Sequence, residues 1–395
     1  MALTFTKNSP RFILRGIFFL LAIQGSSVQA QLVLTTDPIK INLEGYLNAS
    51  VGHSENAKHT NQGAARTTQA EGGLRVYAEH SLAPQQVIGV RVEVNASPQD
   101  HLNVGERSLL YIDSFGRFEI GRRRGLPDSL IGYAPNTYAF TSAEFGVTSG
   151  RTLDPGARLV TSFLPANLAR RIDTISENGA NGAFFGDTSP KALYVSPKVW
   201  GSQLGLSYAP NIENGARLDN PYKELFQAGL AYQEDFGQDF FRLGGSFSYA
   251  NLDEKTVRLF STAPTKDLAS LSIGAALNLG EVWEFGINVS QNNDDKSSSP
   301  GSPRHGAHGI TASVNYNDGE WVYGGYVQRA IGGQNAFGSD RLSALQLGLA
   351  YRLDTKLRVF CALYLYQLDN KPNAGQNQLL KEHGKVFLAG VRWTL

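Results

Sequence analysis

Apolar and polar residues alternate with a period of two along most of the chain after residue 30. In the segment 86–97, Val90 and Val92 stand on one face of an extended chain. Arg91 and Glu93 stand on the other face. Successive side chains of a strand point to opposite sides, so this pattern indicates a strand with one apolar and one polar face. The same alternation recurs in short segments up to the end of the chain, which predicts an all-β protein.

Sixteen segments carry this pattern, and residues typical of turns and loops separate them. The expected strands are 41–53, 72–83, 86–97, 107–114, 116–123, 190–199, 202–209, 225–234, 239–251, 268–279, 282–291, 308–317, 320–330, 342–353, 356–368 and 384–395. Helical periodicity is nearly absent from the chain. Its strongest occurrence is the segment 163–175, FLPANLARRIDTI, which can form a short helix.

The links between the expected strands alternate between short and long. The short links, most of which hold the Gly, Pro or Asp that tight turns need, are 83–85, 114–115, 200–201, 236–238, 280–281, 318–319 and 354–355. The long links are 54–71, 98–106, 124–189, 210–224, 252–267, 292–307, 331–341 and 369–383. Tight turns at one end and long loops at the other are typical of a membrane barrel, which also leaves no backbone edge unpaired in lipid. We therefore predict a 16-stranded antiparallel transmembrane β-barrel.

The N-terminus has the pattern of a secretion signal. Lys7, Arg11 and Arg15 precede the apolar run 16–23, and small residues lead up to Ala30. The apolar run is too short to cross a bilayer as a helix. The expected division is a signal peptide, 1–30, followed by the barrel domain, 31–395.

Composition and charge narrow the class of protein further. The chain has 36 basic and 35 acidic residues, and removal of three basic residues with the signal would leave 33 against 35, a charge of −2. This balance gives no general footprint for nucleic-acid binding. Cys361 is the single cysteine, so no internal disulfide is possible. No later segment approaches 18 consecutive apolar residues, and we expect an exported barrel in the outer membrane.

In such a barrel the apolar face contacts outer-membrane lipid and the polar face lines the lumen. The alternation directs Arg75, Arg91 and Glu93 inward, and Glu44 likewise. An Arg on the lipid side near the bilayer midplane would cost about 2–4 kcal/mol, which makes the inward orientation the expected one.

Three stretches give the chain a resemblance to the general bacterial porins, the trimeric diffusion channels of Gram-negative outer membranes. LLYIDSFGRFEIGRRRG at 109–125 resembles the porin strand pair that ends in Gly-Arg. KALYVSPKVWGSQLGLSYA at 191–209 resembles the porin pattern of two strands around a Gly turn. AEFG at 143–146 resembles the acidic tip of the porins' third loop.

The resemblance implies a homotrimer whose third loop, here 124–189, folds into the lumen as a constriction loop. Glu144 would match the loop carboxylate, while Arg75 and Arg122 would match wall arginines. The sequence departs from the family at Phe140, where many members hold a second acid. It also ends in Leu395 where the family usually ends in Phe, and its third loop is unusually long.

Arg122 shares its nominal strand face with the apolar Phe118 and Ile120, so a strand end or a bulge is needed to turn it inward. Arg123 and Arg124 follow it and can line the pore or anchor the root of the loop. The acids Asp128 and Asp154 belong to the same loop as Glu144. The expected constriction residues are Arg75, Arg91, Glu93, Arg122, Arg123, Asp128 and Glu144.

The leading functional hypothesis is passive diffusion of small hydrophilic solutes and ions through a water-filled pore. The alternative is a substrate-selective or plugged barrel that acts as an uptake channel or adhesin. An enzyme is not expected, because the seven histidines are scattered and no Ser, His and Asp constellation stands out. No cofactor is expected. His305 and His308 form the one loop pair, and a metal site needs more ligands than that.

Overall fold

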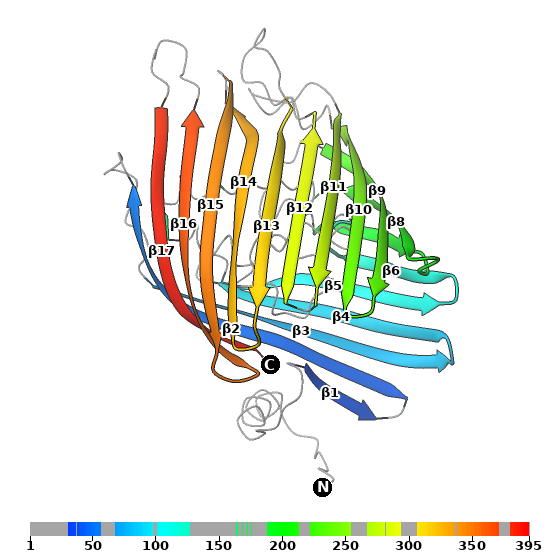
Figure 1. The fold of residues 1–395 in the computed structure, drawn as a ribbon. Coiled ribbons are helices and arrows are strands. Elements are labelled where there is room, and N and C mark those ends of the chain that lie inside the picture. The colour runs from blue at the N-terminus through cyan, green and yellow to red at the C-terminus, as the bar shows by residue number, and fades with distance from the viewer. Residues whose placement is uncertain are drawn as a thin grey trace.

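The computed structural model describes residues 31–36, 38–56, 68–97, 101–126, 163–164, 168, 172, 175, 188–212, 222–253, 267–280, 282–293, 306–335, 338–370 and 380–394. Within these residues, seventeen strands form one sheet (Figure 1). They are β1 (Gln31–Thr36), β2 (Ile39–Asn56), β3 (Thr68–Ala83), β4 (Gln86–Ser97), β5 (His101–Asp113), β6 (Gly116–Arg122), β7 (Pro190–Val195), β8 (Ser202–Asn211), β9 (Tyr222–Phe236), β10 (Asp239–Leu252), β11 (Leu268–Leu279), β12 (Trp283–Asn292), β13 (His308–Asn317), β14 (Trp321–Asn335), β15 (Gly338–Arg352), β16 (Leu357–Asn370) and β17 (Leu380–Thr394).

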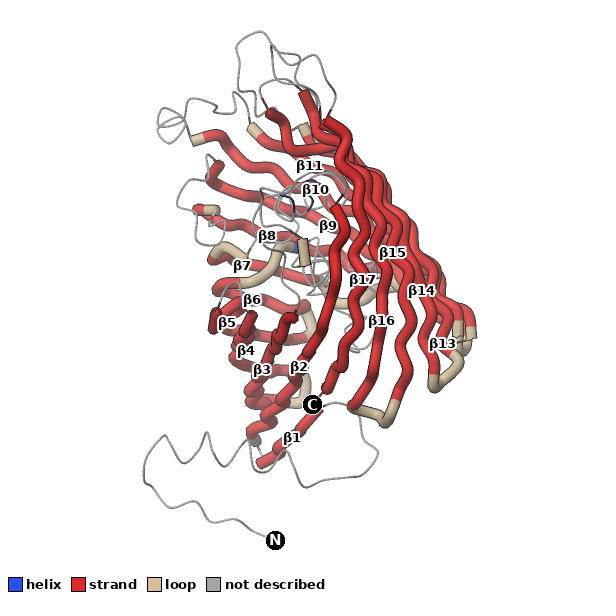
Figure 2. Tube along the Cα trace, turned by 90° about the vertical axis from the view of Figure 1, so that its left-hand side faces the viewer, coloured by secondary structure: helices blue, strands red, loops and turns tan. Residues whose placement is uncertain are grey.

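Strands β2 to β17 close into the predicted 16-stranded antiparallel barrel. Each strand pairs with the next along the chain. The ring closes between β17 and β2, where Thr394 lies opposite Tyr46 and Gly384 opposite Asn56. Figures 1 and 2 show the strands of the two sides crossing at a steep angle, as the tilt of a barrel requires.

β1 is the strand that the hydrophobic pattern did not predict. It pairs antiparallel with Ile39–Glu44 of β2, whereas β17 occupies the same edge of β2 from Tyr46 onward. β1 therefore covers the part of this edge that β17 leaves open, at the lower rim in Figure 1. An open edge would leave backbone N–H and C=O groups without strand partners.

The two faces of the barrel follow the predicted alternation. On β11, Leu271 and Ile273 are each 50% exposed on the outer face. Ser270 and Ser272, on the inner face of the same strand, are each 4% exposed. An apolar outer surface and a polar inner wall are the arrangement that lipid outside and water inside favour.

Most of the predicted short turns and long links are present, but two of the long links are shortened to three residues or fewer. β4 pairs with β5 up to Ser97 and His101, which leaves three residues where 98–106 was expected. β14 pairs with β15 up to Asn335 and Gly338 in place of the link 331–341. In both hairpins the ladder continues into polar residues, where hydrophobic alternation no longer marks a strand. We call the end with the short turns the turn end, and the opposite end the loop end.

Five residues of the long third link pack against the inner wall of β14–β17. Leu168, Ile172 and Ile175 have helical backbone conformation, in agreement with the helix expected over 163–175. Together with Phe163 and Leu164 they form one buried cluster with side chains of these strands. The wall residues of the cluster are Val322, Tyr326, Ala330, Leu342, Ala344, Ala350, Phe360, Ala362, Tyr364, Tyr366, Leu368, Val386 and Leu388.

None of the helical segments in the described part of the chain is long and apolar enough to span a membrane.

Candidate functional site: the charged inner wall of β2–β6

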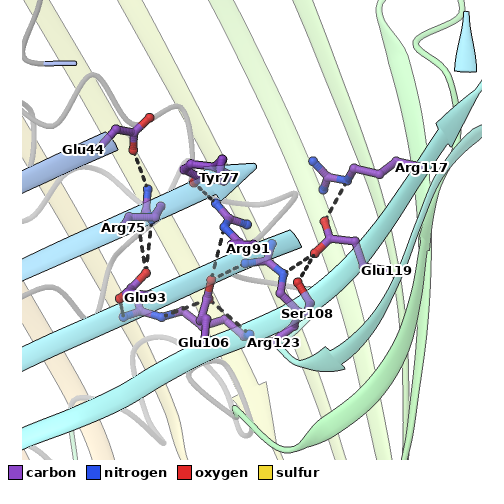
Figure 3. A network of polar contacts seen from close by, with 11 residues as sticks. Glu44, Arg75, Tyr77, Arg91, Glu93, Glu106, Ser108, Arg117, Glu119 and Arg123 are labelled. Carbon is purple, nitrogen blue, oxygen red and sulfur yellow. Dashed lines mark hydrogen bonds and ion pairs between the residues drawn. The ribbon is translucent and has the colours of Figure 1, made fainter. Parts of the chain in front are cut away.

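A row of charged side chains crosses the inner wall from β2 to β5. Glu44 lies directly opposite Arg75, Arg75 opposite Glu93, and Glu93 opposite Glu106. Arg123, which directly follows β6, reaches the same row through an ion pair with Glu106. Figure 3 shows these side chains turned toward one another on neighbouring strands. We call this set, with the neighbours described below, the charged wall.

Arg75 stands between two carboxylates. Its Nη1 lies 3.1 Å from Oε2 of Glu44, and its Nη2 lies 3.1 Å from Oε2 of Glu93. Its Nε donates a further hydrogen bond of 3.2 Å to the same Glu93 oxygen. Arg75 is 6% exposed and Glu93 is 2% exposed. Charge-assisted contacts at both ends of a buried guanidinium hold it in one position.

Glu106 enters the wall because of a β-bulge. Glu93 pairs with Glu106 but Val94 pairs with Val104, so Gly105 is the extra residue of β5. The bulge reverses the alternation, which puts Val104 on the outside and Glu106 on the inside. Two carboxylates directly opposite each other repel.

Three arginines offset this repulsion. Arg91 Nε lies 3.6 Å from Glu106 Oε2, and Arg123 forms an ion pair with the same oxygen. Arg124 bridges the two acids, with Nη2 at 3.7 Å from Glu93 Oε1 and Nε at 3.6 Å from Glu106 Oε1. The acids and the arginines are therefore mutually stabilised.

A second group of contacts extends the charged wall toward the turn end. Arg123 Nε lies 2.6 Å from Glu119 Oε2, and Arg117 Nε lies 3.0 Å from Glu119 Oε1. Ser108 donates a hydrogen bond of 3.3 Å to Glu119. On the other side, Arg91 donates to the Tyr77 hydroxyl, with its guanidinium 4.6 Å from the centre of the Tyr77 ring.

The charged wall has a small net positive charge. It holds five arginines and four glutamates, and five minus four gives +1. Its arginines are Arg75, Arg91, Arg117, Arg123 and Arg124, and its acids are Glu44, Glu93, Glu106 and Glu119. Every arginine contacts at least one of the acids, so the charges are fixed in place by one another.

The structure brings together four of the predicted constriction residues, Arg75, Arg91, Glu93 and Arg123. Asp128 and Glu144, and Asp154 with them, lie outside the described residues. Whether these residues form the narrowest zone of the pore stays a prediction.

Arg122 has a different place in the register from the other predicted arginines. It lies opposite the exposed Arg107, two positions beyond Ile120, which is 68% exposed on the outer face. Glu119 and Arg123 keep the inner alternation, so the register assigns Arg122 to the outer-face position of the strand. The neighbouring Gly121 has φ +144°, a conformation that side chains rarely adopt.

Glu106 was missed in the sequence because the expected strand began at residue 107. The available signal was Gly105, since a glycine inside a strand pattern often marks a bulge. Glu119 and Arg117 were also missed, although they alternate with the apolar Phe118 and Ile120.

No metal site can be identified in the parts of the chain that the structure describes. Among those residues there is no group of three or more His, Cys, Asp or Glu side chains that could hold an ion.

Comparisons with known proteins agree with this architecture. Among solved structures, OmpF of Salmonella typhi in complex with daunomycin is similar with a TM-score of 0.61 at 13% identity, covering 92% of this chain and all of that one. Outer-membrane expressed OmpT of Vibrio cholerae is similar at 0.57 and 14% identity, covering 92% of this chain and 100% of that chain. The anion-selective porin of Comamonas acidovorans is similar with a TM-score of 0.56 at 14% identity, covering 90% of this chain and 100% of that chain. At such identities these likenesses support the fold alone.

Sequence comparison gives the family. No curated protein matches the chain. The family model described as Gram-negative porin matches residues 19–371, which is most of the 395 residues. The chain therefore belongs to the Gram-negative porin family.

Proposed function

We propose that the protein forms a water-filled channel in the outer membrane, through which small hydrophilic solutes and ions diffuse passively. The observation that carries the proposal is the pairing of a closed barrel with an apolar outer face and an ionic inner wall. Such a wall replaces part of the hydration of a passing ion, and fixed charges at a constriction discriminate between solutes. Membership in the porin family supports a channel rather than an enzyme.

The charged wall suits a permanently open filter. Its arginines are held by its own glutamates, so the side chains need no bound solute to keep their positions. The small net charge of +1 predicts a weak preference for anions at this wall. The acids expected in the third loop would reduce this preference.

The location and the assembly are part of the proposal. The family model is described as Gram-negative porin, and one OmpT structure of Vibrio cholerae that resembles this chain is described as a trimer. We propose that this chain likewise forms a homotrimer in the outer membrane. Analytical ultracentrifugation of the folded protein in detergent tests the assembly, and a monomer at all concentrations would contradict it.

Planar-bilayer conductance tests the channel. We expect discrete open steps, in threes if the trimer inserts as a unit, and absence of such steps would contradict passive diffusion. Reversal potentials in a salt gradient test the wall. Arg124→Gln removes a positive charge and Glu44→Gln removes a negative one, so their shifts must have opposite signs. If neither variant shifts the reversal potential, the charged wall is not part of the conduction path.

One observation favours the second candidate, a plugged or substrate-selective barrel. Inner-wall side chains are buried around much of the ring, for example Gln227 at 0%, Ser248 at 2% and Thr311 at 1% exposed. Side chains that face a wide aqueous lumen would be more exposed than this. A wild-type protein that folds but conducts only after removal of the segment 163–175 would support the plugged barrel over the open channel.

A further inference from the structure

The outer face of strands β14–β17 changes from apolar to basic toward the loop end. On β15 this face is apolar from Tyr351 to Leu345, and Arg341 follows after one serine. On β17 it is apolar from Trp393 to Phe387, and a lysine follows at once. Figure 1 shows these strands side by side, with their loop ends at the top. The exposed basic side chains at this end are Arg329, Arg341, Lys381 and Lys385.

The depth of Arg341 in a membrane follows from strand geometry. Tyr351 belongs to a cluster of aromatic rings near the turn end, where its ring centre lies 4.6 Å from that of Trp321. Such aromatic girdles mark the membrane interface. Arg341 is ten positions from Tyr351 on the same face, since 351 minus 341 is 10. This separation is roughly 33 Å along the strand, or roughly 25 Å along the barrel axis at a tilt of about 40°. The apolar band of a membrane barrel is about 25 Å tall, so Arg341 lies at its opposite edge.

Cross-strand pairing brings two of the cations together. Arg341 lies directly opposite Asp369 of β16, and Asp369 lies directly opposite Lys381 of β17. Residues opposite each other on antiparallel strands have Cα atoms about 4.5–5.5 Å apart, so the Cα atoms of Arg341 and Lys381 are roughly 10 Å apart. Both basic side chains are exposed, and Asp369 accepts a hydrogen bond of 3.1 Å from Nε2 of Gln367. One head group can therefore contact both cations.

The charges on this face have a positive balance. Among the side chains that the structure describes on the outer faces of β14–β17 and β2, four are Arg or Lys and two are Asp or Glu, and four minus two gives +2. The carboxylates are Asp369 and Glu55. Glu55 lies 3.0 Å from Nζ of Lys385, and both side chains are more than half exposed. Exposed ion pairs of this kind are weak, so Lys385 can still contact an external anion.

We infer that the outer face of β14–β17 at the loop end binds a lipid whose head group carries phosphate. The phosphate oxygens accept charge-assisted hydrogen bonds from the guanidinium of Arg341 and the ammonium of Lys381. The acyl chains cover the apolar side chains toward the turn end, where Leu347 is 50% and Phe387 is 53% exposed. Cations directly above an exposed apolar surface match an amphiphile and not a free anion.

The inference rests on the proposed location in the outer membrane. In a bacterial outer-membrane barrel the end with the long loops is extracellular, so the lipid belongs to the outer leaflet. Basic side chains near a membrane interface attract anionic lipids and are not penalised as they would be at the bilayer midplane. The lipid site does not depend on whether the lumen conducts.

The test uses the full-length folded protein in detergent and bisphosphorylated lipid A as the probe, with native mass spectrometry to count bound lipid during a titration. The variants are Arg341→Gln, Lys381→Gln and the double variant, and changes of such exposed side chains usually leave the fold intact. The matched control is Lys198→Gln, which removes an exposed lysine from the turn between β7 and β8 at the opposite end of the barrel. Monophosphoryl lipid A is the comparison lipid, and inorganic phosphate is the competitor.

We expect saturable binding of lipid A to the wild-type chain. One basic residue beside an anionic lipid contributes roughly fivefold in affinity, so each single variant should bind about fivefold more weakly and the double variant about 25-fold. Lys198→Gln should bind as the wild type does, and monophosphoryl lipid A should bind more weakly than the bisphosphorylated form.

Absence of saturable binding would overturn the inference, and so would equal affinities of the double variant and Lys198→Gln. Two other results would also overturn it. Displacement of the lipid by inorganic phosphate at equal concentration would indicate a simple anion site, and dissociation of a wild-type trimer in the double variant would indicate a contact between copies of the chain. Binding in detergent involves no conductance, so failure of the lipid site and failure of the proposed channel are separate observations.

Discussion

Replacing Gly52 by alanine should disturb the packing of the third link inside the barrel. Gly52 lies on the inner face of β2, and a Cβ at this position would fall 2.6 Å from Cδ1 of Phe163 and 2.8 Å from its Cγ. Ordinary contacts between carbon atoms are about 3.5–4.0 Å. Phe163 is 0% exposed, so its ring must move by about 1 Å within a filled site.

The expected magnitude follows from this overlap. Inserting a methyl group into a well-packed site costs about 1–3 kcal/mol of stability. Phe163→Ala alone should cost about 3–5 kcal/mol, because it leaves a cavity in the cluster on β14–β17. In the double variant the new methyl group has no ring to overlap, so the two losses should be less than additive, with a coupling of about 1–3 kcal/mol.

The assay is equilibrium unfolding in detergent for the wild type, both single variants and the double variant, together with single-channel conductance. Gly245→Ala is the matched control, because a Cβ there would meet nothing closer than 3.8 Å. Displacement of the packed segment should also change the open-channel conductance of Gly52→Ala but not that of Gly245→Ala. If Gly52→Ala and Gly245→Ala unfold at the same denaturant concentration, or the double variant is strictly additive, the packing of Phe163 on Gly52 is refuted.

Three further predictions concern other parts of the molecule. Glu106→Gln should destabilise the barrel by about 3–5 kcal/mol because it leaves buried arginines uncompensated. The control is Glu55→Gln, which breaks an exposed ion pair with Lys385 and should cost no more than about 1 kcal/mol. Equal losses of stability in denaturant unfolding would contradict the buried network. The carboxylate of Asp267 accepts hydrogen bonds from the Tyr249 hydroxyl and from the backbone N–H of Leu252, and both bonds lower its pKa. The ionised Asp267 carboxylate therefore stabilises the fold above the ordinary aspartate pKa, and this stability is lost as the pH falls through the lower pKa of the folded state. Hydrogen exchange at the loop end of β10 should become faster over this acid range, and Asp267→Asn should abolish the pH dependence. Cys361 is half-buried on the outer face of β16, so an apolar maleimide should label it in liposomes while a charged one should not; labelling of the folded protein by the charged reagent would reverse the assignment of faces.

The barrel strands could be predicted from the sequence because a two-residue alternation is a local property. Each of the sixteen predicted segments overlaps one of the strands β2 to β17, and the inward orientation of Arg75, Arg91 and Glu93 agrees with the alternation. Strict two-residue alternation also places Arg122 and Arg123 on opposite faces of the strand. The resemblance to the porins favoured Arg122, and the ion pairs with Glu106 and Glu119 involve Arg123.

The remaining features depend on contacts between distant segments. The bulge at Gly105 is defined by pairing with β4, and only that pairing puts Glu106 beside Glu93. β1 is too short to show a pattern, and its strand exists because β17 ends before it covers all of β2.

The inner wall of β16 shows most clearly what the tertiary structure decided. From Val359 to Tyr366 both faces of this strand are apolar, so the sequence gives no alternation to separate lipid from lumen. In the structure, Phe360, Tyr364 and Tyr366 face inward and belong to one buried cluster with Phe163 and the helical residues of the third link. A polar lumen would not favour such a wall. It is stable because another part of the chain, about 190 residues earlier, supplies the apolar surface that excludes water from it.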